Sequence, residues 1–131
     1  MPKHVFILDP TDDGPRLATG LTSPDWVTHH ASTVFFTRDA AARQALDALI
    51  IRFRLADERG DAVAFGLTSM QPQLERATML LVDNEADARL ASATNYEIAM
   101  APIDIDAIVS WLNQTPTASA RGSGSRRSPG R

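Results

Sequence analysis

The strongest periodic pattern in the chain lies in residues 37–60, which read TRDAAARQALDALIIRFRLADERG. Apolar residues recur there at spacings of three and four, namely Ala42, Ala45, Leu46, Leu49, Ile50, Phe53 and Ala56. Such spacing places them on one face of an α-helix. Thr37 is suited to cap the start of that helix and Gly60 to end it. The pattern therefore predicts one long amphipathic helix against which the rest of the domain packs.

Short runs rich in β-branched and other apolar residues surround that stretch and predict strands. The predicted strands cover residues 4–8, 17–22, 33–37, 62–70, 77–83 and 95–101. A turn at 10–16 and a polar connection at 23–32 join some of them, and 84–94 and 103–114 predict two shorter helices. These elements do not alternate as regular βαβ repeats. We therefore expect an α+β domain with a small, mainly antiparallel sheet and the long helix packed on one face.

The composition divides the chain into a body and a tail. The 131 residues suit one domain, and 44% of them are hydrophobic, which is enough for a core. Residues 1–114 form the predicted globular domain. Residues 115–131, TPTASARGSGSRRSPGR, contain nine Gly, Pro or Ser residues and nothing apolar larger than alanine. This segment cannot bury a core, so we expect a flexible tail.

The charge is distributed unevenly between these two parts. The formal net charge is −3, from 13 basic and 16 acidic residues. The tail holds no acid and four arginines, which are Arg121, Arg126, Arg127 and Arg131. The body therefore carries nine basic and 16 acidic residues, a net of −7, which repels phosphate backbones. The tail arginines are candidate nucleic-acid contacts, but without aromatic residues beside them we do not expect nucleic acid as the main partner.

Two absences narrow the class of protein further. The sequence contains no cysteine, which excludes disulfides, thiolate metal sites and cysteine nucleophiles. The apolar run near the N-terminus is too short for a signal peptide, and no stretch has the apolar length of a membrane span. We therefore expect a cytoplasmic protein without a membrane contact.

The stretch VFILDPTDDGP, residues 5–15, is the first candidate for chemistry. Asp9, Asp12 and Asp13 follow a buried strand and offer the hard oxygen ligands that Mg²⁺ prefers. Their spacing differs from the Asp-x-Asp of haloacid-dehalogenase-type phosphatases, and no phosphate-binding glycine motif accompanies them. Prolines, adjacent aspartates and glycine also form ordinary turns. A solvated hairpin turn is therefore the favoured interpretation, and a metal site is the alternative.

A histidine pair is the second candidate. On an extended chain, His29 and His30 would point to opposite sides. Either could bind zinc or act as a general base, and His4 could complete a zinc site on paper. No metal-binding spacing such as HExxH is present. Together with the three aspartates, this pair would form a metal-dependent hydrolase or phosphotransferase site if the two loops converged in space.

Three apolar residues are candidates for partner binding. Trp26 lies in a polar stretch, where an aromatic side chain can anchor a partner, although covering the edge of a core is the commoner role. Ile51 and Leu55 lie off the main stripe of the predicted long helix and give it a second apolar edge. Such an edge contacts another layer or a second chain, so these residues motivate a homodimer.

No catalytic constellation stands out, since the serines lack a GxSxG context. Residues 31–46, ASTVFFTRDAAARQAL, resemble the strand, cap and helix of many small bacterial and phage domains, a likeness that implies no activity. We therefore expect a small bacterial or prophage protein without catalytic activity or cofactor, acting as a binding module that contacts itself and an unidentified protein. The alternatives are the metal-dependent enzyme and a nucleic-acid-associated accessory protein that uses its tail.

Overall fold

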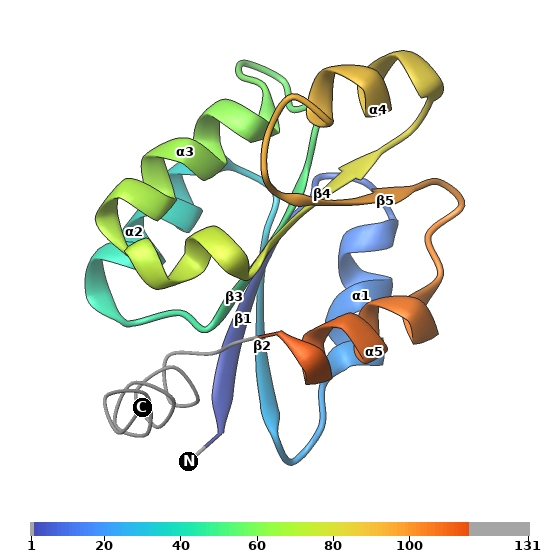
Figure 1. Cartoon of the computed structure of the whole chain (residues 1–131). Coiled ribbons are helices and arrows are strands. Elements are labelled where there is room, and N and C mark those ends of the chain that lie inside the picture. Colours follow the sequence, from blue (N-terminus) through green and yellow to red (C-terminus); the bar gives the residue numbers. More distant parts are fainter. Residues whose placement is uncertain (1, 116–131) are drawn as a thin grey trace, which may run out of the picture.

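A single parallel sheet forms the centre of the protein in a computed structural model, which describes residues 2–115 (Figure 1). Its five strands lie in the order β2-β1-β3-β4-β5, and every neighbouring pair is parallel. Their bounds are β1 Lys3–Leu8, β2 Trp26–Ala31, β3 Ala48–Arg52, β4 Thr78–Val82 and β5 Glu97–Met100. The helices are α1 Asp13–Leu21, α2 Val34–Arg43, α3 Gly60–Met70, α4 Glu85–Ala91 and α5 Ile105–Gln114, with a 3₁₀ turn η1 at Pro72–Arg76.

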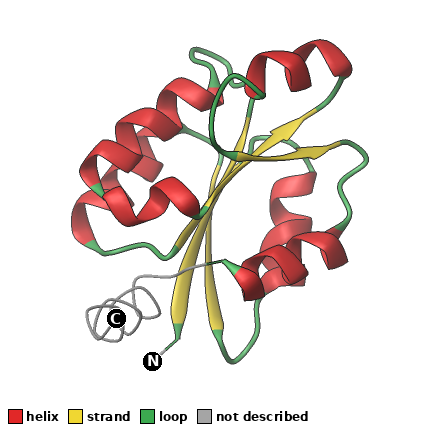
Figure 2. Cartoon of the chain, in the orientation of Figure 1, coloured by secondary structure: helices red, strands yellow, loops and turns green. Residues whose placement is uncertain are grey.

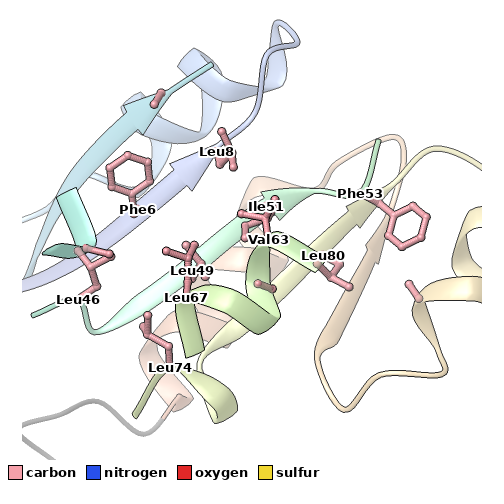
Figure 3. Close-up of a cluster of buried hydrophobic side chains, with 14 of the residues drawn as sticks. Phe6, Leu8, Leu46, Leu49, Ile51, Phe53, Val63, Leu67, Leu74 and Leu80 are labelled. Carbon is pink, nitrogen blue, oxygen red and sulfur yellow. The ribbon is translucent and has the colours of Figure 1, made fainter. Parts of the chain in front are cut away.

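Helices cover both faces of the sheet (Figure 2). Alternate residues of each central strand point to opposite faces, so Ile50 of β3 packs with α1 and α5 while Ile51 packs with α2, α3 and α4. Figure 3 shows part of the core on the face covered by α2, α3 and α4. Leu49 and Leu80 from the strands lie there against Val63 and Leu67 of α3. Because both faces are covered, β3 and β4 are buried along their whole lengths and read as continuous apolar runs.

The expected antiparallel α+β fold is wrong, because the sheet is all parallel and the architecture is doubly wound α/β. The error lies in residues 37–60, which are not one helix. They contain the end of α2, all of β3 and the segment before α3. A strand buried on both faces is apolar at every position, so it supplies apolar residues at helical spacings as well. The residues of β3 therefore look, in the sequence, like part of an amphipathic helix.

Three predicted strands are helical instead. Residues 17–21 belong to α1, 34–37 begin α2 after its N-cap Thr33, and 62–70 belong to α3. In α3 the alternation of Val63, Phe65 and Leu67 resembles a strand, but Phe65 is 70% exposed while Val63 and Leu67 are buried one helical turn apart. Tertiary packing overrides β-branched and aromatic propensity here.

The polar stretch 23–32, predicted as a connection, contains strand β2. The turn predicted at 10–16 contains the start of α1, where Pro15 is tolerated because it lies in the first turn. Predictions elsewhere are confirmed: residues 4–8 and 77–83 contain β1 and β4, and the C-terminal part of the domain contains α4, β5 and α5.

The residues proposed for partner contact lie mostly in the core. Trp26 is 3% exposed and packs under α1 and α5, while Ile51 is fully buried in β3. Leu55 packs partly against the core after β3. The second apolar helix edge therefore does not exist, because its residues are not in a helix. The tail arginines Arg121, Arg126, Arg127 and Arg131 lie outside the described residues. Their expected contact with nucleic acid therefore stays a prediction. Within residues 2–115, no helix is long and apolar enough to cross a membrane.

Candidate functional site

The direction of the chain across the sheet reverses between β1 and β3. From β1 the chain moves outward to β2, and from β2 it returns across β1 to form β3. In open α/β sheets, the crevice outside the carboxyl ends of the strands at this reversal is where ligands bind. Three strands there end in a charged residue: Asp9 follows β1, Arg52 ends β3, and Asp83 follows β4. We call this carboxyl-terminal edge of the sheet, with Asp9, Arg52 and Asp83, the crevice, and it is the candidate functional site.

Arg52 is the centre of the crevice, although its side chain is only 1% exposed. Its Nε donates to Asp9 Oδ1 at 3.2 Å, and its Nη2 donates to Asp9 Oδ2 and to Asp13 Oδ2, each at 2.8 Å. Nη2 also donates to Thr11 Oγ1 at 3.1 Å, and Nη1 donates to Asp83 Oδ1 at 2.8 Å. One guanidinium thus joins the segments that follow β1 and β4.

The local sequence prepares Asp9 for this contact. Asp9 is fully buried, and its Oδ1 also accepts hydrogen bonds from Thr11 N at 2.9 Å and Thr11 Oγ1 at 2.8 Å. These bonds form an Asx turn that directs the chain from β1 into α1. Both carboxylate oxygens of Asp9 are therefore engaged within the protein. The carboxylate serves as a buried anchor for Arg52.

Asp13 and Asp83 complete the cluster from more exposed positions. Asp13 is the first residue of α1 and also accepts a hydrogen bond from Arg16, while the Asp83 side chain is 52% exposed. With all carboxylates ionised, the cluster carries a net charge of −2. Burial works to lower the pKa of Arg52, but the hydrogen bonds and charge of Asp9, helped by Asp13 and Asp83, raise it overall. Arg52 therefore stays charged.

Two glycines permit the close packing around this crevice. A Cβ on Gly14 would lie 2.6 Å from the carbonyl oxygen of Asp9 and would also overlap the ring of His30. A Cβ on Gly60, the first residue of α3, would lie 3.0 Å from the carbonyl carbon of Arg52. Helices α1 and α3 consequently begin directly against the strand ends that carry Asp9 and Arg52.

The predicted metal residues are only partly brought together. Asp9 and Asp13 share Arg52, whereas Asp12 is exposed and lies outside the cluster. His30 is close, because its Nε2 lies 3.0 Å from the carbonyl oxygen of Asp9. Its neighbour His29 points to the opposite face, as expected of adjacent strand residues. Among residues 2–115, no group of three or more His, Cys, Asp or Glu side chains is arranged to hold a metal ion.

His29 instead pairs with His4 on the face covered by α2. His4 Nδ1 and His29 Nε2 are 2.9 Å apart and share a hydrogen bond between β1 and β2. Desolvation, and secondarily the charge of His4, lower the pKa of His29. The ring of His29 also lies nearly parallel to that of Phe6. This pair is therefore separate from the crevice.

A second ion pair connects the segment after β3 to helix α4. Arg54 Nη2 donates to Asp87 Oδ1 at 2.7 Å, and Arg54 Nε contacts both carboxylate oxygens. Asp87 is nearly buried, and its backbone N–H donates to the side chain of Asn84, which caps α4. Arg52 and Arg54 therefore hold the start of the β4–α4 segment at two points.

Arg52 and Asp83 were not among the predicted site residues, although the sequence carries a signal for both. VFILD, ALIIR and MLLVD are three apolar runs that each end in a charged residue. If all three are parallel strands, their ends meet at one edge of the sheet. The prediction of a long helix hid the second run, so this pattern was not recognised. A hollow of about 810 Å³ lies beside Phe65 and Tyr96, and its lining includes none of the residues that contact Arg52.

No protein-family model and no curated protein matches the sequence. Solved structures do match the fold. A CheY-like response regulator receiver domain protein from Methanospirillum hungatei JF-1 has a TM-score of 0.75 at 10% identity, covering 87% of this chain and 93% of that one. The signal receiver domain of an HD domain-containing protein from Pseudomonas fluorescens Pf-5 has a TM-score of 0.75 at 18% identity, covering 87% and 94%. The BeF₃-activated receiver domain of DrrB has a TM-score of 0.71 at 10% identity, covering 87% and 97%.

The fold is therefore that of CheY-like receiver domains. This likeness contradicts the expected fold, and it also counts against the expected function of an uncharacterised, self-associating binding module, because the similar structures are described as receiver domains. The alternative of a metal-dependent hydrolase or phosphotransferase required the Asp9–Asp13 turn and the His29–His30 loop to converge in space. The structure brings His30 close to Asp9 but leaves Asp12 exposed and turns His29 to the opposite face of the sheet. Arg52 lies among the carboxylates and holds oxygens that a metal would need.

Proposed function

We propose that this chain is a receiver-type signalling domain, in which the ionic cluster at the strand ends sets how helix α4 is presented to a protein partner. The observation that carries this proposal is the double connection from β3 to the β4–α4 segment. Arg52 holds Asp83 and, two residues later, Arg54 holds Asp87. A change at the crevice would therefore move the start of α4.

The contacts between the end of β3 and the start of α4 are short, charged hydrogen bonds. Asp83 directly precedes Asn84, whose side chain caps α4, and Asp87 lies in the first turn of the same helix. Charged hydrogen bonds of this kind are stronger and more geometrically specific than neutral ones. Leu90 on α4 and Met100 at the end of β5 are exposed apolar residues on neighbouring elements. They offer a surface through which a partner would detect the position of α4.

The names of the similar structures support the same class of function. They are described as receiver domains, and the DrrB domain is described as BeF₃-activated, so that protein exists in an activated form. Proteins with this fold thus include domains with a signal-dependent state. For the present chain, the partner is expected to be a protein and the location the cytoplasm.

A second copy of the chain is a further candidate partner. The residues that first suggested it, Ile51 and Leu55, are not on an exposed helix edge. Phe35 and Phe36 in the first turn of α2 are 71% and 60% exposed and contact each other edge to face. If two copies pair through these exposed rings, sedimentation should show a dimer whose fraction rises with protein concentration. F36S should weaken that dimer.

Partner capture from lysates of the source cells tests the main proposal. The tagged full chain is compared with R54Q, which breaks the contact between Arg54 and Asp87 while leaving the buried Arg52 in place. We expect R54Q to retain about a third of the partner or less, which is at least a threefold loss of binding. R43Q, which breaks the exposed pair of Arg43 with Asp39 on α2, is the matched control and should retain all of it. Equal retention by R54Q and the wild type would contradict the proposal.

A further inference from the structure

Carboxylates from three segments meet in the crevice, and such an arrangement needs a positive charge to be stable. Asp9, Asp13 and Asp83 come from the end of β1, the start of α1 and the end of β4. Like charges held this close repel each other unless a cation lies between them. In many proteins Mg²⁺ serves this purpose, bound by one or two carboxylates together with phosphate oxygens. The receiver fold and the BeF₃-activated relative make Mg²⁺ and a phosphoryl group the ligands to test here.

The residues present do not fit Mg²⁺. That ion needs near-octahedral oxygen ligands at about 2.0–2.1 Å. In this crevice, Arg52 Nη2 already lies 2.8 Å from an oxygen of Asp9 and 2.8 Å from an oxygen of Asp13. Arg52 Nη1 holds Asp83 at the same distance. A cation bound to these oxygens would lie against the guanidinium.

The two buried residues at the centre of the cluster, Arg52 and Asp9, also do not fit a phosphoryl acceptor. Nucleophiles that take a phosphoryl group carry a free lone pair, as a carboxylate or an imidazole does. A guanidinium has five N–H donors, no acceptor and a permanent charge. Asp9 is buried and its two oxygens already accept hydrogen bonds from Arg52 and Thr11.

Arg52 is held in this position by burial and by charge. Its side chain is 1% exposed and lies between the ends of β1 and β4, and Gly60 closes against its backbone. If the guanidinium left, Asp9 would remain as an unpaired buried charge, which is strongly unfavourable. Of the three carboxylates that contact Arg52, Asp83 is the most open to solvent, with its side chain 52% exposed against 25% for Asp13.

We propose that Arg52 is a built-in substitute for a divalent cation, so that the carboxylate cluster holds its arrangement without Mg²⁺. This inference rests on the proposed signalling function and concerns the regulation of the same crevice. It predicts a receiver-type domain whose output depends neither on Mg²⁺ nor on a phosphoryl donor that needs Mg²⁺. Regulation would then act most readily on the contact between Arg52 and Asp83, which is the most exposed of the three carboxylates.

The test measures Mg²⁺ and BeF₃⁻ binding by thermal shift and by backbone amide NMR on the full chain. The wild type should show no saturable change near residues 9–13, 52 and 83 at about 10 mM Mg²⁺, a concentration sufficient for ordinary protein Mg²⁺ sites. R52D places a fourth carboxylate in the crevice and should bind Mg²⁺ at least about tenfold more tightly than the wild type. Its melting temperature should rise with Mg²⁺ by mass action, which is measurable even if R52D is less stable.

R52N is the second variant, because it removes the guanidinium without adding a charge. It should also gain a Mg²⁺ response, though a weaker one than R52D. R43Q removes an exposed arginine charge far from the crevice and should behave as the wild type. A saturable Mg²⁺ or BeF₃⁻ response of the wild type would overturn the inference. So would the absence of any Mg²⁺ response in both R52D and R52N, since the carboxylates would then not form a cation site.

Partner capture separates this inference from the proposed function. Wild-type capture should be the same in EDTA and in Mg²⁺ with BeF₃⁻. Capture that needs Mg²⁺ or BeF₃⁻ would overturn the inference while leaving the signalling function in place. A wild type that is silent toward Mg²⁺ and captures no partner would overturn the signalling function, while R52D gaining Mg²⁺ would still support the role of Arg52.

Discussion

Arg52 and Asp9 form a fully buried, two-point ion pair: Nε meets one carboxylate oxygen at 3.2 Å and Nη2 meets the other at 2.8 Å. The residues are 43 positions apart in the chain and lie at the ends of adjacent parallel strands. A buried pair of this kind adds little net stability over a well-packed apolar pair, but losing one partner is costly. The pair therefore makes both residues hard to replace singly.

Replacing Arg52 alone should destabilise the domain strongly. We expect R52M to lower the free energy of unfolding by about 3–5 kcal/mol, because it leaves Asp9 charged and buried without a partner. The double variant D9N/R52M should recover part of that loss, since asparagine carries no charge. Urea unfolding of the three proteins measures both effects. A loss below about 1 kcal/mol in R52M would show that water reaches Asp9 after all.

Two glycines in α3 should respond to alanine in opposite directions. An added Cβ on Gly60 would meet the backbone of Arg52, so we expect G60A to lose about 1–3 kcal/mol. Gly66 has no atom within 4 Å of such a Cβ, so G66A should gain about 0.5–1 kcal/mol from helix propensity. Chemical denaturation of both variants gives the comparison. Similar values for the two would mean that helix propensity alone governs α3.

The cap of α4 should control the local stability of the proposed output helix. Asn84 Oδ1 accepts from the backbone N–H of Asp87 at 2.9 Å, and N84A removes that bond. A loss of about 1 kcal/mol is expected for an N-cap of this type. Hydrogen exchange should become faster in residues 85–91 while α5 stays unchanged. Uniform acceleration across the whole domain would argue against a local effect.

The pair of His29 with His4 should make stability depend on pH. Desolvation, followed by the charge of His4, lowers the pKa of His29 in the folded protein below its usual value of 6.5. A lowered pKa means that the folded state binds the proton more weakly than the unfolded chain. Neutral His29 therefore contributes its full stabilisation above about pH 6.5. This stabilisation is lost as the pH falls through the lower pKa that His29 has in the folded protein.

H29Q removes this titration and is the comparison. Urea midpoints between about pH 7.5 and 5.5 should fall more steeply for the wild type than for H29Q, which isolates His29 from the carboxylates that titrate at lower pH. NMR titration of the imidazole should place the pKa of His29 below that of a model histidine. Parallel midpoint curves for the two proteins would show that His29 is not perturbed.

Much of the local structure was readable from the sequence, yet the topology was not. VFIL and MLLV read as strands because a short run that is apolar at every position and bounded by turn residues is typical of a buried strand. ALIIR has the same character, but its flanks continue a spacing of three and four. Periodicity alone cannot separate a doubly buried strand from a buried piece of helix. Without β3, the βαβ alternation that signals a parallel sheet is no longer visible.

The sequence by itself determined that acidic residues follow apolar strands, and it placed Asp9 and Asp13 among the candidate site residues. What these carboxylates do was decided only by the tertiary structure. The strand order brings the end of β3 beside the ends of β1 and β4, and Arg52 then pairs with residues 43, 39 and 31 positions away. Burial removes water as a competitor, so the guanidinium and the carboxylates satisfy one another. A local pattern that suggested a metal site thus became an internal ion cluster because the fold placed an arginine inside it.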